Sequence, residues 1–162
     1  MRKLITIAAI STAFVIAAPT TYALASPSHD QVTGTGALGQ FGDPTVHVNA
    51  NQTESGPKGS FVVTYPDGTY VHGKVTCLFT SKNVTYVTGK ITESHGPRRT
   101  PNNWSPGNFL VVGVQDNGGT GAGGPDDLNF SPGFATNPGC GPNGDAVPVF
   151  PTVSGGYQVV DA

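Results

Sequence analysis

The chain has 162 residues, only 11 % of them charged, and a formal net charge of −2 at pH 7. Its few basic residues form no block, whereas nucleic acids and anionic membranes both require a concentrated basic face. The composition therefore argues against either as a partner. The length is that of one domain with a modest core.

The N-terminus has the form of a cleavable secretory signal peptide. Arg2 and Lys3 provide a basic start, and residues 4–18 are an apolar run of the expected length. Ala23-Leu24-Ala25 has the A-x-A form that signal peptidase reads. A transmembrane anchor is the alternative, but the run is shorter than the ~20 residues that cross a bilayer, and Pro19 interrupts it. We expect a secreted, extracellular protein without a membrane anchor.

The remainder is rich in glycine and proline. All 23 Gly and all but one of the 14 Pro follow residue 25, a proportion close to that of disordered chains. They crowd into a few stretches, and the segments between them are rich in Val, Thr, Tyr and Phe, which is typical of strands joined by long turns. We expect a signal peptide over 1–25, a flexible leader over 26–43 with any first strand near its end, and a single β domain over 44–162.

Alternating apolar and polar side chains predict the strands in chain order. The first covers residues 45–50. The clearest unit is a hairpin in which Phe61, Val63 and Tyr65 share one face, Pro66-Asp67-Gly68 forms the turn, and residues 70–80 return. On the return strand, the set expected to face the core is Val71, Val75, Cys77 and Phe79.

Further strands are expected over residues 84–93, 108–116, 127–131 and 158–160. Gly73 and Gly89 lie on the core-facing sets of neighbouring strands, where an interior glycine often marks a bend. No helical periodicity of useful length follows the leader. The expected fold is all-β: a mostly antiparallel meander forming a small barrel or coiled sandwich with long Gly/Pro-rich loops.

The two cysteines, Cys77 and Cys140, are predicted to form a disulfide. An isolated pair in an oxidising compartment is most simply bonded, and closing a loop of this length contributes about 4 kcal/mol in the chain-entropy model. A metal site or a catalytic thiol is the alternative. Neither is favoured, because the pair has no C-x-x-C spacing and a histidine lies close to only one of the cysteines.

Three segments resemble a small β module of secreted bacterial proteins, the post-COAP-1 type. They are the sequences Gly59-Ser60-Phe61-Val62-Val63-Thr64-Tyr65, Val71-His72-Gly73-Lys74-Val75-Thr76-Cys77-Leu78, and Val114-Gln115-Asp116-Asn117-Gly118 followed by Pro125-Asp126-Asp127. The similarity covers roughly residues 56–160. It implies a secreted bacterial β domain and brings no catalytic residues.

Residues 95–104 form the candidate contact loop. They contain the only paired arginines, Arg98 and Arg99, and the only tryptophan, Trp104. Exposed Trp and Arg are typical binding anchors. The alternative is a solvated loop in which Trp104 caps the core.

A weaker candidate is a calcium site built from Asp116, Asp126 and Asp127 around a Gly-rich loop, since calcium prefers several oxygen ligands. The spacing does not match an EF-hand. Turn and capping hydrogen bonds by the same carboxylates are the simpler interpretation.

The sequence favours a non-catalytic extracellular domain with a binding or structural role, no cofactor and an unidentified partner. No set of titratable residues converges as a hydrolase would require, and the motifs of common hydrolases are absent. One alternative is a protease inhibitor that presents the 95–104 loop, and a less favoured one is an enzyme with a site in a barrel mouth. The oligomeric state is left open.

Overall fold

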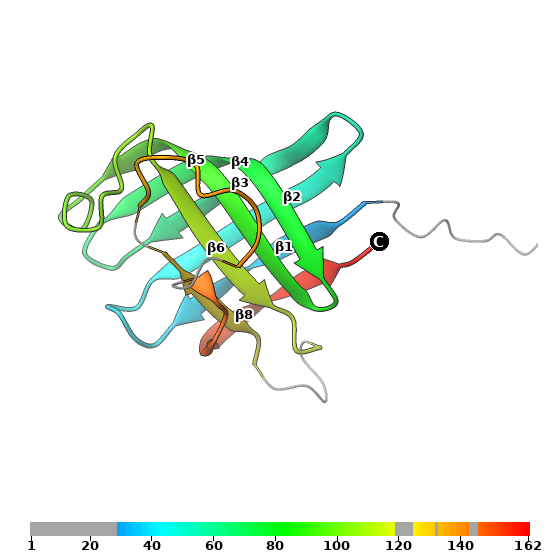
Figure 1. The fold of residues 1–162 in the computed structure, drawn as a ribbon. Helices are drawn as coiled ribbons and strands as arrows, with labels where there is room; N and C mark the ends of the chain where they lie inside the picture. Colours follow the sequence, from blue (N-terminus) through cyan, green and yellow to red (C-terminus); the bar gives the residue numbers. More distant parts are fainter. Residues whose placement is uncertain (1–28, 119–124, 132, 143–145) are drawn as a thin grey trace, which may run out of the picture.

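The structure is a computed structural model that describes residues 29–118, 125–131, 133–142 and 146–162. Eight antiparallel strands form a closed barrel in which each strand pairs with the next and the last pairs with the first (Figure 1). The strands are β1 (Gln31–Leu38), β2 (Thr45–Thr53), β3 (Gly56–Thr64), β4 (Tyr70–Ser81), β5 (Val84–His95), β6 (Phe109–Gln115), β7 (Asp127–Phe130) and β8 (Phe150–Val160).

The predicted all-β, antiparallel fold is confirmed, and the barrel rather than the sandwich is the form it takes. The predicted signal peptide lies outside the described residues. Within the described ranges, no helix has the length and apolar character needed to cross a membrane.

The barrel interior is filled by side chains from every strand, as expected of eight strands. The predicted hairpin has the register that places Phe61 opposite Gly73 and Val63 opposite Val71. The fully buried interior side chains include Val32, Val46, Val48, Phe61, Val63, Val71, Val87, Leu110, Val112, Val114 and Leu128.

Gly73 and Gly89 leave the space in this core that the Phe61 ring occupies. A Cβ atom added at either glycine would lie 2.2 or 2.3 Å from a carbon of that ring, which is closer than van der Waals contact permits. An aromatic ring packed flat over strand glycines fills the space their missing side chains leave. The sequence-based expectation of a bend or close approach at these glycines therefore has a specific cause.

The prediction of a flexible leader over residues 26–43 is wrong for β1, which pairs with both β2 and β8. Its inward positions are Val32, Gly34, Gly36 and Leu38, so glycine hides the usual apolar alternation. The Tyr157 ring lies against Gly34 and Gly36. Its hydroxyl accepts a hydrogen bond from the Gly36 N–H and donates one to the Val46 carbonyl, at 3.0 and 2.8 Å.

The expectation that Cys77 and Phe79 face the core is also wrong. The pairing of β4 with β5 skips one residue between Val75 and Cys77, so Thr76 is bulged. Beyond a bulge of this kind the alternation is inverted. Leu78 takes the inward position, whereas Phe79 is 42 % exposed on the outer face.

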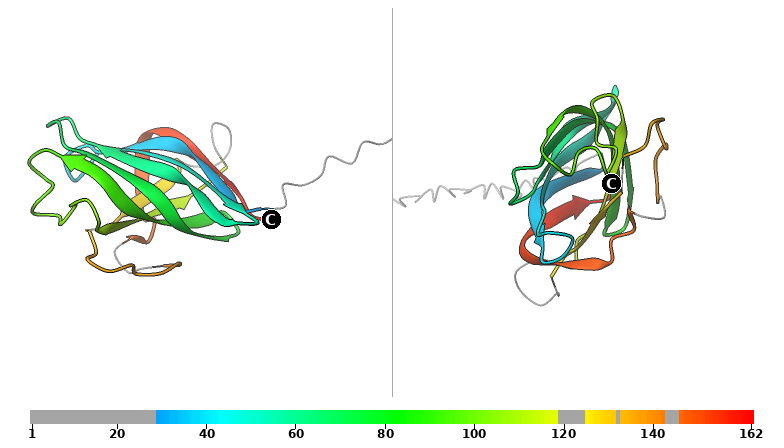
Figure 2. Two further views of the ribbon diagram at one scale, coloured as in Figure 1. Left: turned by 90° about the horizontal axis from the view of Figure 1, so that it is seen from above. Right: turned by 90° about the vertical axis from the view of Figure 1, so that its left-hand side faces the viewer.

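The chain between β7 and β8 crosses the outside of the barrel, over β5 and β6 (Figures 1 and 2). We call residues 133–142 of this segment the cover. Tyr86, Thr88 and Val111 point outward from β5 and β6, yet they are 8 %, 1 % and 0 % exposed. Both faces of β6 are thus buried, which explains its continuous apolar sequence.

Candidate functional site

The predicted contact loop closes one end of the barrel. Residues 97–103 fold into successive turns, with backbone bonds that include Asn102 N–H to the Arg98 carbonyl and Trp104 N–H to the Arg99 carbonyl. Trp104 is only 2 % exposed and stacks against Tyr65, with ring centroids 5.9 Å apart. The expectation of an exposed tryptophan anchor is therefore wrong, and Trp104 caps the core.

Arg98 is held against the barrel rather than extended into solvent. Its Nε donates to the Asp67 carboxylate at 2.6 Å, and its Nη1 donates to the Phe41 carbonyl at 3.1 Å. Its guanidinium also lies 4.4 Å from the centre of the Tyr65 ring, in the cation–π geometry. Arg99 is exposed. Of the two predicted arginine contacts, Arg98 is engaged within the chain and Arg99 is free to face solvent.

The protonation behaviour of Tyr65 and Asp67 reflects these contacts. Burial raises the pKa of Tyr65 to about 12, although the Arg98 charge acts in the opposite direction. Hydrogen bonds from Thr69, and then the neighbouring Arg98, hold the pKa of Asp67 below its usual value. Asp67 therefore stays ionised near neutral pH, which suits its pairing with Arg98.

The three aspartates of the proposed calcium site serve as acceptors for the chain itself. Asp126 is 3 % exposed, and its two oxygens accept hydrogen bonds from the Asn117 and Tyr157 N–H groups. Asp116 accepts from the Gly118 N–H at 2.8 Å and from the Val159 N–H at 3.1 Å. Asp127 accepts from the Asn117 side chain at 3.3 Å.

The contacts to the Tyr157 and Val159 N–H groups lie where strand pairing in the barrel is shortest, between β7 and β8. β7 and β8 pair at only two positions, Asp127 with Pro151 and Leu128 with Phe150. Further along β8, the carboxylates of Asp126 and Asp116 take the place of a neighbouring strand. Among the described residues no group of three or more His, Cys, Asp or Glu side chains could hold a metal ion. The geometry matches the alternative interpretation, in which these carboxylates cap backbone donors.

The histidines on the outer face have local partners. Nδ1 of His47 lies 2.8 Å from the Thr35 hydroxyl, and Nδ1 of His72 lies 3.2 Å from that of Thr92. His95 stacks on Tyr70, with centroids 5.0 Å apart. Two of these contacts join a histidine to a threonine hydroxyl, but among the described residues no carboxylate bonds either histidine, so neither pair forms a triad of the kind that activates a hydroxyl nucleophile.

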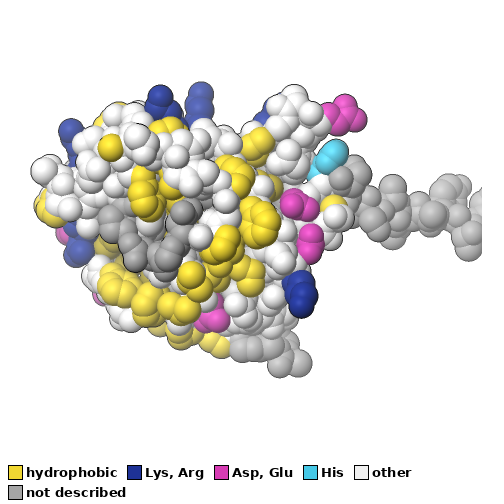
Figure 3. Space-filling view, in the orientation of Figure 1, with side chains coloured by type: hydrophobic (Ala, Val, Ile, Leu, Met, Phe, Trp, Pro, Cys, Tyr) yellow, Lys and Arg dark blue, Asp and Glu magenta, His cyan; other side chains and the backbone are white. Residues whose placement is uncertain are grey.

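An exposed apolar strip lies where the chain enters β8. Residues 146–153 alternate: Ala146, Pro148 and Thr152 are buried and Phe150 is half-buried, whereas the other four are exposed and face outward. The outward set, which we call the apolar strip, is Val147, Val149, Pro151 and Val153. Val149 is 57 % exposed and Val153 is 68 % exposed. Figure 3 shows hydrophobic side chains gathered over this part of the molecule.

Phe41 extends the apolar strip at the capped end of the barrel. Its ring is 54 % exposed and lies edge-on to Phe150, with centroids 4.9 Å apart. Its φ of 59° is in the left-handed region, which aromatic residues rarely adopt. Backbone strain of this kind persists only where the surroundings hold it, and it is concentrated at functional sites.

Sequence reasoning missed the apolar strip. Its signal is the run from Ala146 to Val153, in which every second residue is Val or Pro and all but one of the others are Ala, Pro or Phe. Such a run indicates a strand that is apolar on both faces. The prolines and neighbouring glycines made this stretch resemble a loop.

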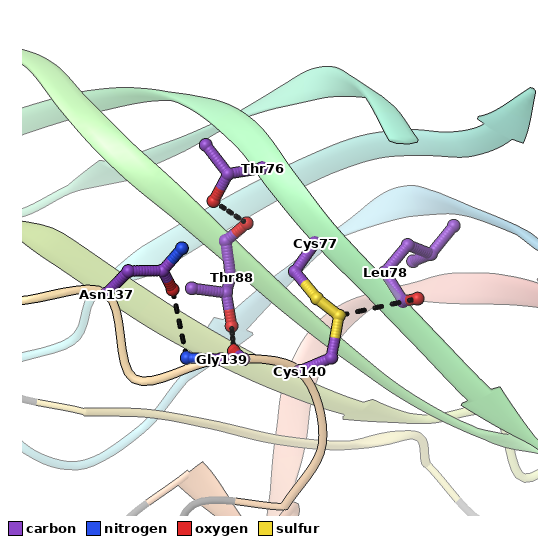
Figure 4. Close-up of a disulfide and its surroundings, with 7 residues drawn as sticks. All are labelled: Thr76, Cys77, Leu78, Thr88, Asn137, Gly139 and Cys140. Carbon is purple, nitrogen blue, oxygen red and sulfur yellow. Dashed lines mark hydrogen bonds between the residues drawn. A yellow bond between two sulfur atoms is a disulfide. The ribbon is translucent and has the colours of Figure 1, made fainter. Parts of the chain in front are cut away.

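The predicted disulfide between Cys77 and Cys140 is present, with Cα atoms 5.5 Å apart. It joins the outer face of β4 to the cover (Figure 4). Beside it, the Thr88 hydroxyl donates to the Gly139 carbonyl at 2.8 Å.

Comparison of the chain with protein-family models, curated proteins and solved structures gave no match. The resemblance to the post-COAP-1 type therefore stays a prediction.

Proposed function

We propose that this chain is a non-catalytic extracellular binding domain that contacts a protein partner through the apolar strip and Phe41. The observation that carries the proposal is the exposure of Val149 and Val153. The barrel interior is already filled, so burying these side chains requires another molecule. Exposed apolar side chains gathered on one surface mark interaction sites in soluble proteins.

The surroundings of the apolar strip favour a protein partner. Phe41 lies at one end of it, and the Arg98 guanidinium is bonded to the Phe41 carbonyl. Protein interfaces combine an apolar centre with aromatic and arginine side chains in this way. A surface of five side chains is small for a protein interface, so the contact is expected to be moderate and reversible unless neighbouring polar residues join it.

The contact is expected to use side chains rather than strand addition. β1 pairs with β8 only from Thr152 onward, which leaves the backbone of Phe150 and Pro151 on that side without a strand. Proline lacks the N–H donor that an added strand would require. Pro148 and Pro151 thus keep this edge from pairing with strands of other molecules.

The protease-inhibitor alternative has less support. Protease clefts take an extended segment, as in strand addition, whereas residues 97–103 are coiled in turns. Of the two arginines in the loop, Arg98 is paired with Asp67, and Arg99 alone is exposed. If the mature protein nevertheless inhibited a trypsin-like enzyme, and changing Arg98 and Arg99 abolished this, the inhibitor function would replace the one proposed.

The proposal is tested by tagged protein secreted into the medium of the producing cells. We compare the native chain with the double variant Val149→Ser/Val153→Ser by size-exclusion chromatography. The matched control is Asn49→Ser/Asn51→Ser, on the polar outer face of β2. The native chain and the control are expected to elute in a complex, and the strip variant as the isolated chain. Identical elution of all three would contradict the proposal.

A further inference from the structure

The Cys77–Cys140 disulfide lies on the outside of the barrel rather than in its core. The bulge at Thr76 turns Cys77 outward, where it is half-buried, and Cys140 is exposed on the cover. All eight strands are joined to their neighbours by strand pairing, so the barrel closes without the disulfide. What the disulfide fastens is the cover (Figure 4).

The cover has a firm start and a looser middle. At its start, the backbone groups of Phe134 and Phe109 exchange two hydrogen bonds, at 2.8 and 2.7 Å. Further along, Gly139 is bonded to Thr88 and Cys140 to Cys77, Gly141 is buried, and residues 135–142 belong to no strand. The Cys77–Cys140 bond is the one covalent link between the middle of the cover and the barrel wall.

We propose that the Cys77–Cys140 disulfide is a thiol-sensitive clasp. Its reduction releases residues 135–142 from the barrel wall and uncovers the outward side chains of Tyr86, Thr88 and Val111, while the barrel stays closed. Phe79 already lies exposed beside Tyr86, with ring centroids 6.4 Å apart. Opening therefore enlarges an existing aromatic surface on β4 and β5.

The reductant is a dithiol. One of its thiolates attacks the sulfur of Cys140, the more exposed residue of the two, the Cys77–Cys140 bond breaks, and Cys77 leaves as a thiolate that takes up a proton. The second thiol of the reductant then attacks the mixed disulfide and releases Cys140 as a thiol. Two electrons and two protons pass to the protein, and the reductant becomes a disulfide.

Hydroxyl-radical labelling tests the clasp on three samples of the mature chain: oxidised, reduced with a phosphine that is then removed, and carrying Cys77→Ser/Cys140→Ser. We expect labelling of Tyr86, which is buried in the oxidised protein, to rise at least fivefold in the last two. Amide exchange of β1, β2 and β3 should be unchanged. The far-ultraviolet circular dichroism of all three should agree.

Thr88→Val in the oxidised protein is the matched control, because it removes the Gly139 hydrogen bond and keeps the disulfide. Its Tyr86 should be labelled within about twofold of the native level. Three outcomes would overturn the clasp: amide exchange that rises across the whole barrel on reduction, labelling of Tyr86 that does not rise on reduction, or labelling of Tyr86 in Thr88→Val as strong as in the reduced protein.

Discussion

At the scale of single residues, the barrel is built around three aromatic side chains: Phe61, Trp104 and Tyr157. Two of them lie over glycines, Phe61 on Gly73 and Gly89, and Tyr157 on Gly34 and Gly36. Trp104 instead caps the end of the core beside Tyr65 and Phe130. At each of these positions the ring limits the size of the residues that can lie against it.

Gly73, which lies beneath the Phe61 ring, is not expected to tolerate even one added methyl group. Gly73→Ala should lower the free energy of unfolding by about 1–3 kcal/mol, because the added Cβ would overlap the ring. In a Phe61→Leu background the same substitution should cost markedly less. Urea unfolding of the four proteins of this double-mutant cycle checks the pair. A full, unchanged cost in that background would place the effect elsewhere.

Trp104 is expected to contribute through its shape rather than its polar group, because its buried Nε1 has no hydrogen-bond partner among the residues that the structure describes. Removing an unpaired buried donor relieves a desolvation cost. Trp104→Phe should therefore cost less than about 1.5 kcal/mol, and Trp104→Ala about 3–5 kcal/mol. Thermal unfolding measures both, and equal losses would argue for a partner of the indole N–H.

Tyr65 is expected to make the free energy of unfolding fall at alkaline pH. Its pKa is raised from 10.0 to about 12, so the unfolded chain loses this proton first. The stabilisation is fully present below pH 10 and is lost as pH rises from 10 to about 12. Tyr65→Phe should flatten the fall in stability over that interval in urea titrations. An unchanged slope would show that Tyr65 titrates normally. Tyr157, whose pKa is also raised by burial, continues to titrate in both proteins.

At the scale of elements, the sequence predicts strands well where an alternating apolar set faces the core. The boundaries of β4, β5 and β6 lie within two residues of those expected. β1 is missed because Gly34 and Gly36 occupy inward positions, where a pattern search requires large side chains. The bulge at Thr76 has no recognisable sequence pattern. Alternation alone therefore places the residues that follow it on the wrong face of β4.

β8 illustrates a different limit. Only residues 158–160 were expected, whereas the strand begins at Phe150. Pro151 and the Gly155-Gly156 pair interrupt the alternating pattern of the strand. The backbone N–H groups of Tyr157 and Val159 donate to the side chains of Asp126 and Asp116, which lie in another part of the chain. Contacts between residues so distant in sequence are fixed by the closure of the barrel, and the local pattern does not contain them.

Asp126 is expected to hold the β7–β8 join together. Asp126→Ala should cost about 1–3 kcal/mol, because it leaves the buried N–H of Tyr157 without an acceptor. Amide exchange should rise first at β7 and β8. Asp127→Ala, which removes only a longer bond to the Asn117 side chain, is the control and should be close to neutral. Equal effects of the two would mean that the carboxylates do not act as separate caps.

At the scale of the whole molecule, parts of the surface differ in polarity and in whether another segment of the chain covers them. β1 to β4 present polar side chains such as His47, Asn49 and Lys74 to solvent. The outer wall of β5 and β6 lies beneath the cover. The apolar strip, by contrast, is left without a partner at the start of β8. This uneven distribution is the basis of the proposed binding role.

Site-specific photo-cross-linking tests that role most directly. A photoreactive phenylalanine analogue replaces Val149 on the apolar strip or, in the control, Asn49 on the polar face of β2, and the protein is irradiated in the medium of the producing cells. We expect a discrete cross-linked protein from position 149 and none from position 49. The same products from both positions, or no product from position 149, would contradict the account.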